Sequence, residues 1–368
     1  TETVTYITAK NIYFDENSGG YSLSKILVLD AEASVVSASG VLADYTENIY
    51  VTSKSVYLYN TTWESRIEWW SFDWIDAQKT MIYYFDIQNA TLDYKGGIEV
   101  TGYPHGNFSF HENNNNLFMA FHDYTTNDNG IQTISIGEEL KNTNTLSGIA
   151  TGESLQSVRF IEDKAYLVTF KFVDPLFIID LAIPTAPVVL GELKVNGYSS
   201  YLHGIFDNVL LGVGFEANSE GIITGAKINS INVSSATPVE IDSAGIVNTY
   251  SSFNASYDHH AFTWYESHKL LALTYSGEKS GAIIYRLDAT GAILDAAAIE
   301  SPNTSSEFYD YSSTNGRIIF VDETLYYIDG GLIKAYPISA LVFSVDNKSI
   351  TIESETVSFI DTIPLLLK

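Results

Sequence analysis

Short runs of alternating apolar and polar residues dominate the chain, and small or polar residues separate these runs. Clear examples begin at Asn48 (Asn-Ile-Tyr-Val-Thr-Ser), Ser55 (Ser-Val-Tyr-Leu-Tyr), Ala165 (Ala-Tyr-Leu-Val-Thr-Phe) and Ala282 (Ala-Ile-Ile-Tyr-Arg-Leu). β-Branched and aromatic residues at a period of two, bounded by Gly, Asn, Asp or Pro, are typical of β-strands. Helical periodicity is nearly absent, since only the stretch from Gly137 favours a single turn. The pattern predicts an all-β protein.

The most apolar strand of each predicted hairpin recurs along the chain with an average spacing of about 52 residues. These strands begin near Ile12, Ile49, Leu117, Ala165, Val209, Leu270 and Leu325. Each is generally followed by a turn and a second strand that often ends in Asp. Repeats of about 40–50 residues with several strands each are typical of propeller blades.

Seven repeats predict a seven-bladed β-propeller, with six or eight blades left open. A ring of blades leaves only short, protected sheet edges, which suits a chain with so many strands. We expect one domain over residues 1–368, in which the segment Leu341 to Glu353 supplies a strand that closes the ring with the N-terminal strands. A pair of β-sandwiches is the alternative fold.

The stretch from Ser157 to Leu287 resembles a known family. The resemblance rests on the run from Arg159 to Leu181, on the run from Pro184 to Val195, on Gly197-Tyr-Ser-Ser-Tyr-Leu-His203 and on Tyr257-Asp-His-His-Ala-Phe262. In these runs the chain is similar to the β-propeller domain family of secreted and cell-surface proteins of archaea and bacteria. The resemblance implies a propeller at the cell exterior, and it carries no established activity.

Several residues of these runs are expected to be structural. Asp174-Pro175 forces an extended or turn conformation, which predicts a tight hairpin before Leu176. His203 and His260 each lie near the start of a strand that contains an aromatic residue, where we expect hydrogen bonds that tie strands together. Asp174, Pro175, His203 and His260 are therefore interpreted as structural residues.

The sequence marks no catalytic, cofactor-binding or metal-binding residue. His259 and His260 would point to opposite faces of a strand, so their two rings are not expected to bind one ion. The chain has no His-Glu-x-x-His, no Gly-x-Ser-x-Gly and no cysteine. A pair of carboxylates, as in glycoside hydrolases, stays open because the chain has 45 acidic residues.

Calcium is the one cofactor left open. Asp15–Gly20 and Asp123–Gly130 are oxygen-rich segments, but neither has the ligand spacing of an EF-hand. Asn129-Gly130 is also typical of a hairpin turn with two residues of positive φ. The plain turn is therefore the favoured interpretation.

The segment from Trp63 to Trp74 holds four of the five tryptophans. It lies in the longest spacing between repeats, so we interpret residues near 61–78 as an insertion in one blade. Exposed tryptophans stack on sugar rings or bind other proteins, whereas alternating Trp and Phe also fit packing on a blade face. The candidates for a contact surface are Trp63, Trp69, Trp70 and Trp74.

The net charge of −26 makes binding to nucleic acid or to anionic membrane surfaces unfavourable. No apolar run approaches about 18 residues, which predicts no direct membrane insertion. No signal peptide opens the chain, so we interpret it as a mature form. Since neutral polar groups dominate the expected surface, we also expect the fold to persist to about pH 3.

Asn-x-Ser/Thr sequons occur slightly more often than the four to five that chance gives for about this composition. They begin at Asn60, Asn89, Asn107, Asn232, Asn254, Asn303 and Asn347. Most lie in turn-like sequences, as acceptors of N-linked glycans do, whereas Phe108 and Phe110 predict a strand around Asn107. We expect an N-glycosylated protein at the cell surface or outside the cell.

The function predicted from these features is a non-catalytic interaction or structural scaffold, whose partners are other surface proteins or glycans. One alternative is a carbohydrate-binding module that uses the segment Trp63 to Trp74. The other is a hydrolase with a carboxylate pair in the central channel of the propeller. The identity of the partner and the oligomeric state stay open.

Overall fold

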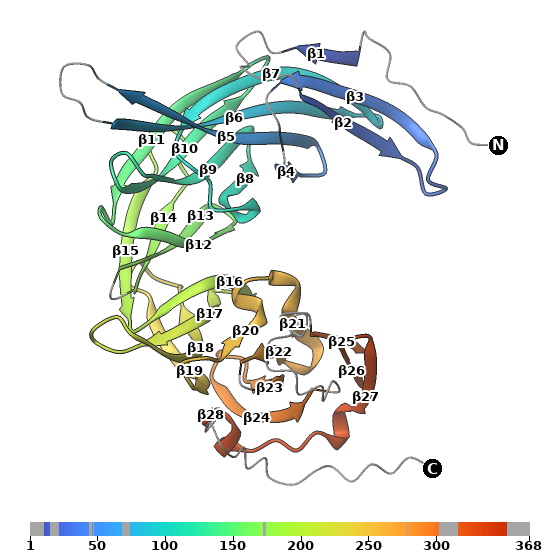
Figure 1. Ribbon diagram of the computed structural model, residues 1–368, viewed down its shortest axis with the longest axis vertical. Coiled ribbons are helices and arrows are strands. Elements are labelled where there is room, and N and C mark those ends of the chain that lie inside the picture. The colour runs from blue at the N-terminus through green and yellow to red at the C-terminus, as the bar shows by residue number, and fades with distance from the viewer. Residues whose placement is uncertain are drawn as a thin grey trace. The chain divides into compact units, whose positions relative to one another are not determined.

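The computed structural model describes residues 11–14, 22–43, 46, 48–67, 74–171, 174–277, 279–301 and 316–351 of the 368-residue chain. The described residues are almost entirely β-strands and turns, arranged in seven sheets (Figure 1). They cluster into two compact units, the first within residues 1–155, 162–164 and 180–188 and the second within residues 156–161, 165–179 and 189–368. The all-β prediction is confirmed, and the single domain stays a prediction.

Three sheets lie in the first unit. The first sheet has the order β1 (Ile12–Phe14), β3 (Val35–Ala43), β2 (Ser22–Leu29). The second has the order β4 (Asn48–Val51), β5 (Ser55–Ile67), β6 (Trp74–Gln88), β7 (Thr91–Thr101). The third has the order β11 (Leu140–Ile149), β10 (Asp128–Ile136), β9 (Asn116–Asp123), β8 (Phe110–Asn113).

Most of the fourth sheet and all of the remaining described sheets belong to the second unit. The fourth sheet contains β12 (Ser154–Ile161), β13 (Lys164–Phe170), β14 (Asp174–Asp180) and β15 (Val188–Val195). The fifth contains β16 (Tyr198–Phe206), β17 (Val209–Ala217), β18 (Ile223–Asn232), β19 (Val239–Val247) and β28 (Ser349–Thr351).

The last two sheets come from the end of the chain. The sixth contains β20 (Ser252–Phe253), β22 (Leu270–Ser276), β23 (Gly281–Leu287) and β24 (Ile293–Glu300), and β21 (Phe262–Tyr265) also pairs with β22. The seventh contains β25 (Arg317–Val321), β26 (Thr324–Asp329) and β27 (Leu332–Pro337).

The strand near the C-terminus joins the fifth sheet. Residues Ser349, Ile350 and Thr351 of β28 pair in parallel with residues 245–247 of β19. In the described part of the segment from 341 to 353, the strand thus pairs with β19 and not with a strand from the N-terminus. Closure of a ring by the two ends, and the blade count of that ring, stay predictions.

Five of the repeat strands named from the sequence lie inside their sheets, with a paired strand on each side. They are the strands β9, β13, β17, β22 and β26. Four of them, β9, β13, β17 and β22, are buried on both faces, and β17 is buried at all positions but Glu216. Along β26, buried positions alternate with half-buried ones. Ile49 instead lies in the first strand of its sheet, β4, because the equivalent buried strand β5 begins at Ser55.

Alternation of side chains explains how one strand serves two cores. On β5, Val56 and Leu58 pack with residues of the first sheet, whereas Tyr57 and Tyr59 pack with residues of the third sheet. Successive side chains of a strand point to opposite faces, so an apolar run without polar interruptions buries both faces. In the second unit, the fourth and fifth sheets share a core of the same kind.

The Asp residues that follow strands form local turns. The Asp30 carboxylate accepts the amide of Ser34 at 2.7 Å, and the Asp288 carboxylate accepts the amides of Thr290 at 2.7 Å and Ala292 at 3.0 Å. These bonds satisfy backbone N–H groups where the strand ends. No helix among the described residues has the length and apolar character needed to cross a membrane.

Candidate functional site

A short turn in the second unit brings three ligand-type side chains together. His259–Ala261 form the 3-10 helix η4, and the carboxylate of Asp258 caps it by accepting the backbone amide of His260 at 3.0 Å. Asp is favoured at this position because it satisfies a free N–H of the first turn. Ligand atoms of Asp258, His259 and His260 lie within 4.8 Å of one another. We call these three residues the Asp258 cluster.

The two adjacent histidines do not alternate between faces. Their ring centroids are 3.9 Å apart, so His259 and His260 lie against each other. The prediction of opposite faces is wrong because it assumed a strand. In a 3-10 helix successive side chains are about 120° apart rather than 180°, and the cap at Asp258 starts such a helix here.

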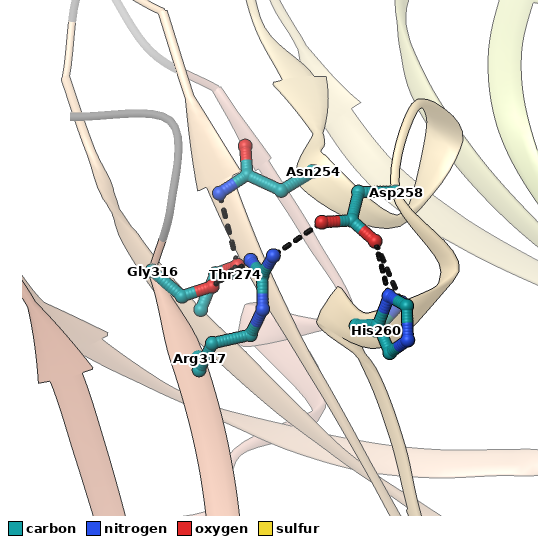
Figure 2. A network of polar contacts seen from close by, with 6 residues as sticks. All are labelled: Asn254, Asp258, His260, Thr274, Gly316 and Arg317. Atoms are coloured by element: carbon teal, nitrogen blue, oxygen red, sulfur yellow. Dashed lines mark hydrogen bonds and ion pairs between the residues drawn. The ribbon is translucent and has the colours of Figure 1, made fainter. Parts of the chain in front are cut away.

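Asp258 is held from both sides (Figure 2). One carboxylate oxygen accepts a hydrogen bond from Nδ1 of His260 at 2.9 Å, and the other forms an ion pair with Arg317. Arg317 also donates to the backbone carbonyl of Gly316 at 3.0 Å. The carboxylate is therefore fixed in orientation, whereas the His260 side chain is 71% exposed.

The same carbonyl of Gly316 links the surface to a buried asparagine (Figure 2). The Thr274 hydroxyl donates to Gly316 at 3.0 Å, and the side-chain amide of Asn254 donates to that hydroxyl at 3.0 Å. Asn254 is only 5% exposed. A continuous path of hydrogen bonds thus runs from the interior of the second unit to the Asp258 cluster.

The charges of the cluster shift the pKa values of its members. Partial burial raises the pKa of Asp258. Hydrogen bonds from His260 and the charges of Arg317 and His260 lower this pKa by more, so the net shift is downward. Burial, followed by the charge of His260, lowers the pKa of His259, and Arg159 and Arg317 add to this effect. At neutral pH the carboxylate is charged and the His259 ring is neutral.

His203 lies beside the cluster. Its ring stacks on Phe262 at a centroid distance of 4.4 Å, and its Nδ1 forms a 3.0 Å hydrogen bond with the hydroxyl of Tyr201. Burial, assisted by the charge of Arg159, lowers the pKa of His203 to about 4. Tyr201 also faces the ring of His259 at 6.4 Å. The two family-like runs that end at His203 and Phe262 therefore meet in space.

A second group of side chains lies in the first unit. Trp63 of β5 is 57% exposed, Tyr103 is 37% exposed and Tyr124 is 53% exposed. The ring of Tyr124 lies 5.5 Å from Trp63 and 6.3 Å from Tyr103, measured between centroids. We call Trp63, Tyr103 and Tyr124 the aromatic platform. The sequence indicated only the first of these, because the tyrosines are separated from it by 40 and 61 positions.

The Trp-rich segment continues a hairpin. Residues 61–67 extend β5 and residues 74–78 begin β6, and the two strands pair up to Ile67 and Trp74. Trp69 and Trp70 lie outside the described residues, and for Trp74 only the backbone is described. Of these four tryptophans, Trp63 is the one whose side chain is described, and the contact surface predicted from them stays a prediction.

Three sequons lie at exposed turns or strand ends. Asn89 lies in the turn between β6 and β7 with φ of 51°, and Asn232 ends β18. Asn107 is exposed and begins the 3-10 helix η2 (Asn107–Ser109), so the strand predicted around it is wrong and β8 begins only at Phe110. Gly106, which has φ of 80°, is the N-cap residue of this helix.

The other described sequons are less accessible. Asn60 is half-buried within β5, and the half-buried Asn347 donates its amide to the carbonyl of Ala296 at 3.2 Å. Asn254 is buried in the network described above. Asn303 lies outside the described residues. Glycosylation at each of these positions stays a prediction.

The segment Asp123–Gly130 forms a hairpin in a different place from that predicted. The turn lies at residues 124–127, and Asn129 and Gly130 belong to β10. The Asp128 carboxylate accepts the amide of Gly148 at 2.6 Å and the hydroxyl of Thr151 at 3.1 Å. Calcium binding there stays a prediction, and Asp15–Gly20 lies outside the described residues.

Asn129 is a fully buried centre of hydrogen bonds. Its amide donates to the carbonyls of Ile149 and Glu153, both at 3.0 Å, and its oxygen accepts Nδ1–H of His122 at 2.8 Å. The register between β10 and β11 shifts between Asn129 and Ile131, next to these hydrogen bonds. Asn129 thus stabilises an irregularity of the third sheet.

The Asp174-Pro175 pair begins β14, and Pro175 is buried. Its position directly after the link from β13 agrees with an extended residue before proline. For Asp174 only the backbone is described, so its structural role stays a prediction.

Comparison with known proteins gives consistent matches. A family model described as the beta propeller domain matches residues 1–341. An uncharacterized protein of Methanocaldococcus jannaschii is 34% identical over 212 residues, which are 56% of this chain and 31% of that protein. An uncharacterized protein of Archaeoglobus fulgidus is 34% identical over 199 residues, which are 54% of this chain and 30% of that protein. The match thus spans about a third of the length of these curated relatives.

Among solved structures, a protein of Bacteroides uniformis with the provisional name 6-phosphogluconolactonase is 10% identical. Its TM-score is 0.46, and the match covers 86% of this chain and 91% of that chain.

Proposed function

This chain belongs to the beta propeller domain family, and on that premise we propose that it is a non-catalytic interaction scaffold at the cell exterior. The net charge of −26 favours repulsion from nucleic acids and anionic lipids, which supports partners of another kind. Exposed sequons at turns support an exterior location with N-linked glycans.

The aromatic platform is the observation that carries this proposal. Large aromatic side chains are usually covered in a folded domain, and exposed ones that contact each other mark surfaces that bind partners. Trp63, Tyr103 and Tyr124 come from three separate segments and lie ring to ring. Tyrosine and tryptophan supply large contact areas at a small cost in side-chain entropy.

Co-sedimentation of the full chain with cell envelopes of its native source tests the scaffold. We expect the Trp63→Ala/Tyr124→Ala double variant to bind about tenfold or more weakly than the unchanged chain. Tyr250→Ala is the matched control, because Tyr250 is also strongly exposed but lies outside the platform. Equal binding by all three chains would contradict the platform as the contact surface.

Carbohydrate binding is the second candidate, and the same platform favours it. Sugar rings present C–H faces that stack on Trp and Tyr. A glycan array with the unchanged chain and the double variant separates the two candidates. Binding that the double variant loses supports a carbohydrate ligand, whereas absence of binding by either chain overturns this candidate and leaves the envelope assay as the test of the first.

The intact mass of the natively purified protein tests the exterior location. We expect additional mass in hexose-sized steps, which Asn89→Gln and Asn232→Gln reduce because both residues are exposed. The matched control is Asn254→Gln, whose amide is buried and should carry no glycan. A mass equal to that of the bare chain would contradict glycosylation.

A further inference from the structure

We propose that Asp258, His259 and His260 form a binding site for a late first-row divalent metal ion such as Zn²⁺ or Cu²⁺. The proposal goes beyond the interaction scaffold, since it concerns a different unit and does not use the aromatic platform. It rests on the placement of three donor side chains and on the way the surrounding network holds one of them.

The three donors are close enough to share an ion. Their ligand atoms lie within 4.8 Å of one another. Metal–nitrogen bonds of about 2.0–2.1 Å place the donors of a tetrahedral site about 3.3 Å apart, so the side chains must close in by up to about 1.5 Å when an ion binds. His259 and His260 are both exposed, so rotation of their side chains can bring the donor atoms closer together. The η4 turn keeps both rings on one side, which a strand would not do.

Asp258 is already oriented for the role of an anionic ligand. Arg317 binds one of its oxygens, and the other oxygen accepts the Nδ1–H of His260, which an ion would replace. Hydrogen bonds that fix the ligands of a metal are a regular feature of metal sites. The path from Arg317 through Gly316 to Thr274 anchors this arrangement in the interior of the unit.

The chemistry of the donors selects the kind of ion. Two imidazole nitrogens and one carboxylate oxygen suit Zn²⁺, Cu²⁺ and Ni²⁺, whereas Ca²⁺ and Mg²⁺ prefer six or more oxygen ligands. Three protein ligands leave a position for water or for a group of a bound partner. The positive charges of Arg317 and Arg159 act against the ion, so these residues reduce the affinity.

Calorimetric titration of the full chain with Zn²⁺ tests the proposal. We expect one site that His259→Ala and His260→Ala each weaken about tenfold or more, whereas excess Ca²⁺ does not compete. His105→Ala is the matched control, since His105 is an exposed histidine of the other unit and should leave the affinity unchanged. Circular dichroism spectra of the variants show whether each keeps its strands.

A charge variant sharpens the test. Arg159→Gln removes a positive charge that acts on His259 without removing a ligand, so the Zn²⁺ affinity should rise about twofold to fivefold. Zn²⁺ affinities that are the same in the unchanged chain and in both histidine variants would overturn the proposal. A loss of affinity that is equal in His105→Ala would overturn it as well, because the ion would then bind histidines without preference.

Discussion

Asn129 and Asn254 are buried asparagines in the two compact units, and their hydrogen bonds lead to different places. Asn129 binds backbone carbonyls and the buried ring of His122, so its network closes inside the first unit. Asn254 binds Thr274, and from there the network continues to Gly316, Arg317 and the exposed Asp258 cluster. The same residue type thus stabilises an irregularity of a sheet in the first unit and supports a surface site in the second.

The difference predicts how much stability each asparagine provides. A closed network leaves several buried polar groups without partners when its centre is removed, and water cannot replace them. In an open network the residues nearest the surface keep other partners or reach solvent, so the loss of the asparagine should cost less stability. Substitutions in the two networks, ordered here from the largest expected effect to the smallest, can confirm or contradict this distinction.

Asn129→Ala should have the largest effect. It removes the partners of Ile149, Glu153 and His122 at once, and we expect a loss of about 3 kcal/mol in the free energy of unfolding. Urea denaturation followed by circular dichroism measures the loss. The control is Asn196→Ala at an exposed position, which should change the free energy by less than about 0.5 kcal/mol. A loss below about 1 kcal/mol for Asn129→Ala would contradict the closed network.

Asn254→Ala should have a smaller effect. It removes the bonds to Thr274 and Ser276, but the Thr274 hydroxyl keeps its bond to Gly316. We expect a loss of about 2 kcal/mol, measured by the same denaturation experiment. If Asn254→Ala destabilised the protein as much as Asn129→Ala, the distinction between a closed and an open network would not hold.

The two regions also show what the sequence could predict. Period-two alternation predicted the strands, and the recurrence of buried strands located β9, β13, β17, β22 and β26, because sheet packing depends on local patterns of apolar residues. Asp30 and Asp288 were recognisable because their turns involve only neighbours in sequence.

Features that depend on distant segments could not be predicted. Asn129-Gly130 has the composition of a hairpin turn, but both residues lie in β10. A Cβ on Gly130 would lie 2.1 Å from the carbonyl oxygen of Leu146 and 2.8 Å from the ring of Phe121, so the glycine permits close packing and not a positive φ. These contacts come from other strands and leave no local signal.

The Asp258 cluster was not predicted from the sequence, and distant segments are part of the reason. A cap at Asp258 followed by His259 and His260 is a local signal for a helical turn, and it could have been recognised in the sequence. The approach of Arg317 from β25 and of Thr274 from β22 could not, because these residues are separated from Asp258 by 59 and 16 positions. The site was missed because a strand was assumed through it.

Acid titration tests whether the His203 ring, which lies near the open network, is held in its neutral form. The pKa of His203 is about 4 in the folded protein against 6.5 ordinarily, so the unfolded chain binds more protons between these values. Stability from this group is complete above about pH 6.5 and is lost as the pH falls towards 4, by about 1.5 kcal/mol after allowance for solvent near the half-buried ring.

The measurement compares two chains at two pH values. His203→Gln keeps a polar group near Tyr201 but does not titrate, so its free energy of unfolding should fall about 1.5 kcal/mol less between pH 7 and about pH 4 than that of the unchanged chain. His105→Gln, at an exposed position, should behave like the unchanged chain. Equal pH dependence of His203→Gln and the unchanged chain would show that His203 is not held neutral, and unfolding of all chains near pH 4 would contradict an acid-stable fold.

Arg317→Ala should have the smallest effect on stability. It also gives the most direct test of whether Asn254 and the Asp258 cluster are energetically coupled. Arg317 and Asp258 are both partly exposed, so we expect a loss of only about 0.5 kcal/mol in the free energy of unfolding. The loss should be smaller still at about 1 M NaCl, because salt screens the pair.

Double variants test whether Arg317 and Asn254 are energetically coupled. The loss in Arg317→Ala/Asn254→Ala should differ from the sum of the two single losses by about 0.5 kcal/mol, because both residues act on the Thr274–Gly316 link. The double variant with Asn129→Ala should be additive, because the partners of Asn129 include no residue of that link. Additivity in both pairs would mean that Asn254 and the Asp258 cluster are neighbours without energetic coupling, and the open network would then be a description of contacts alone.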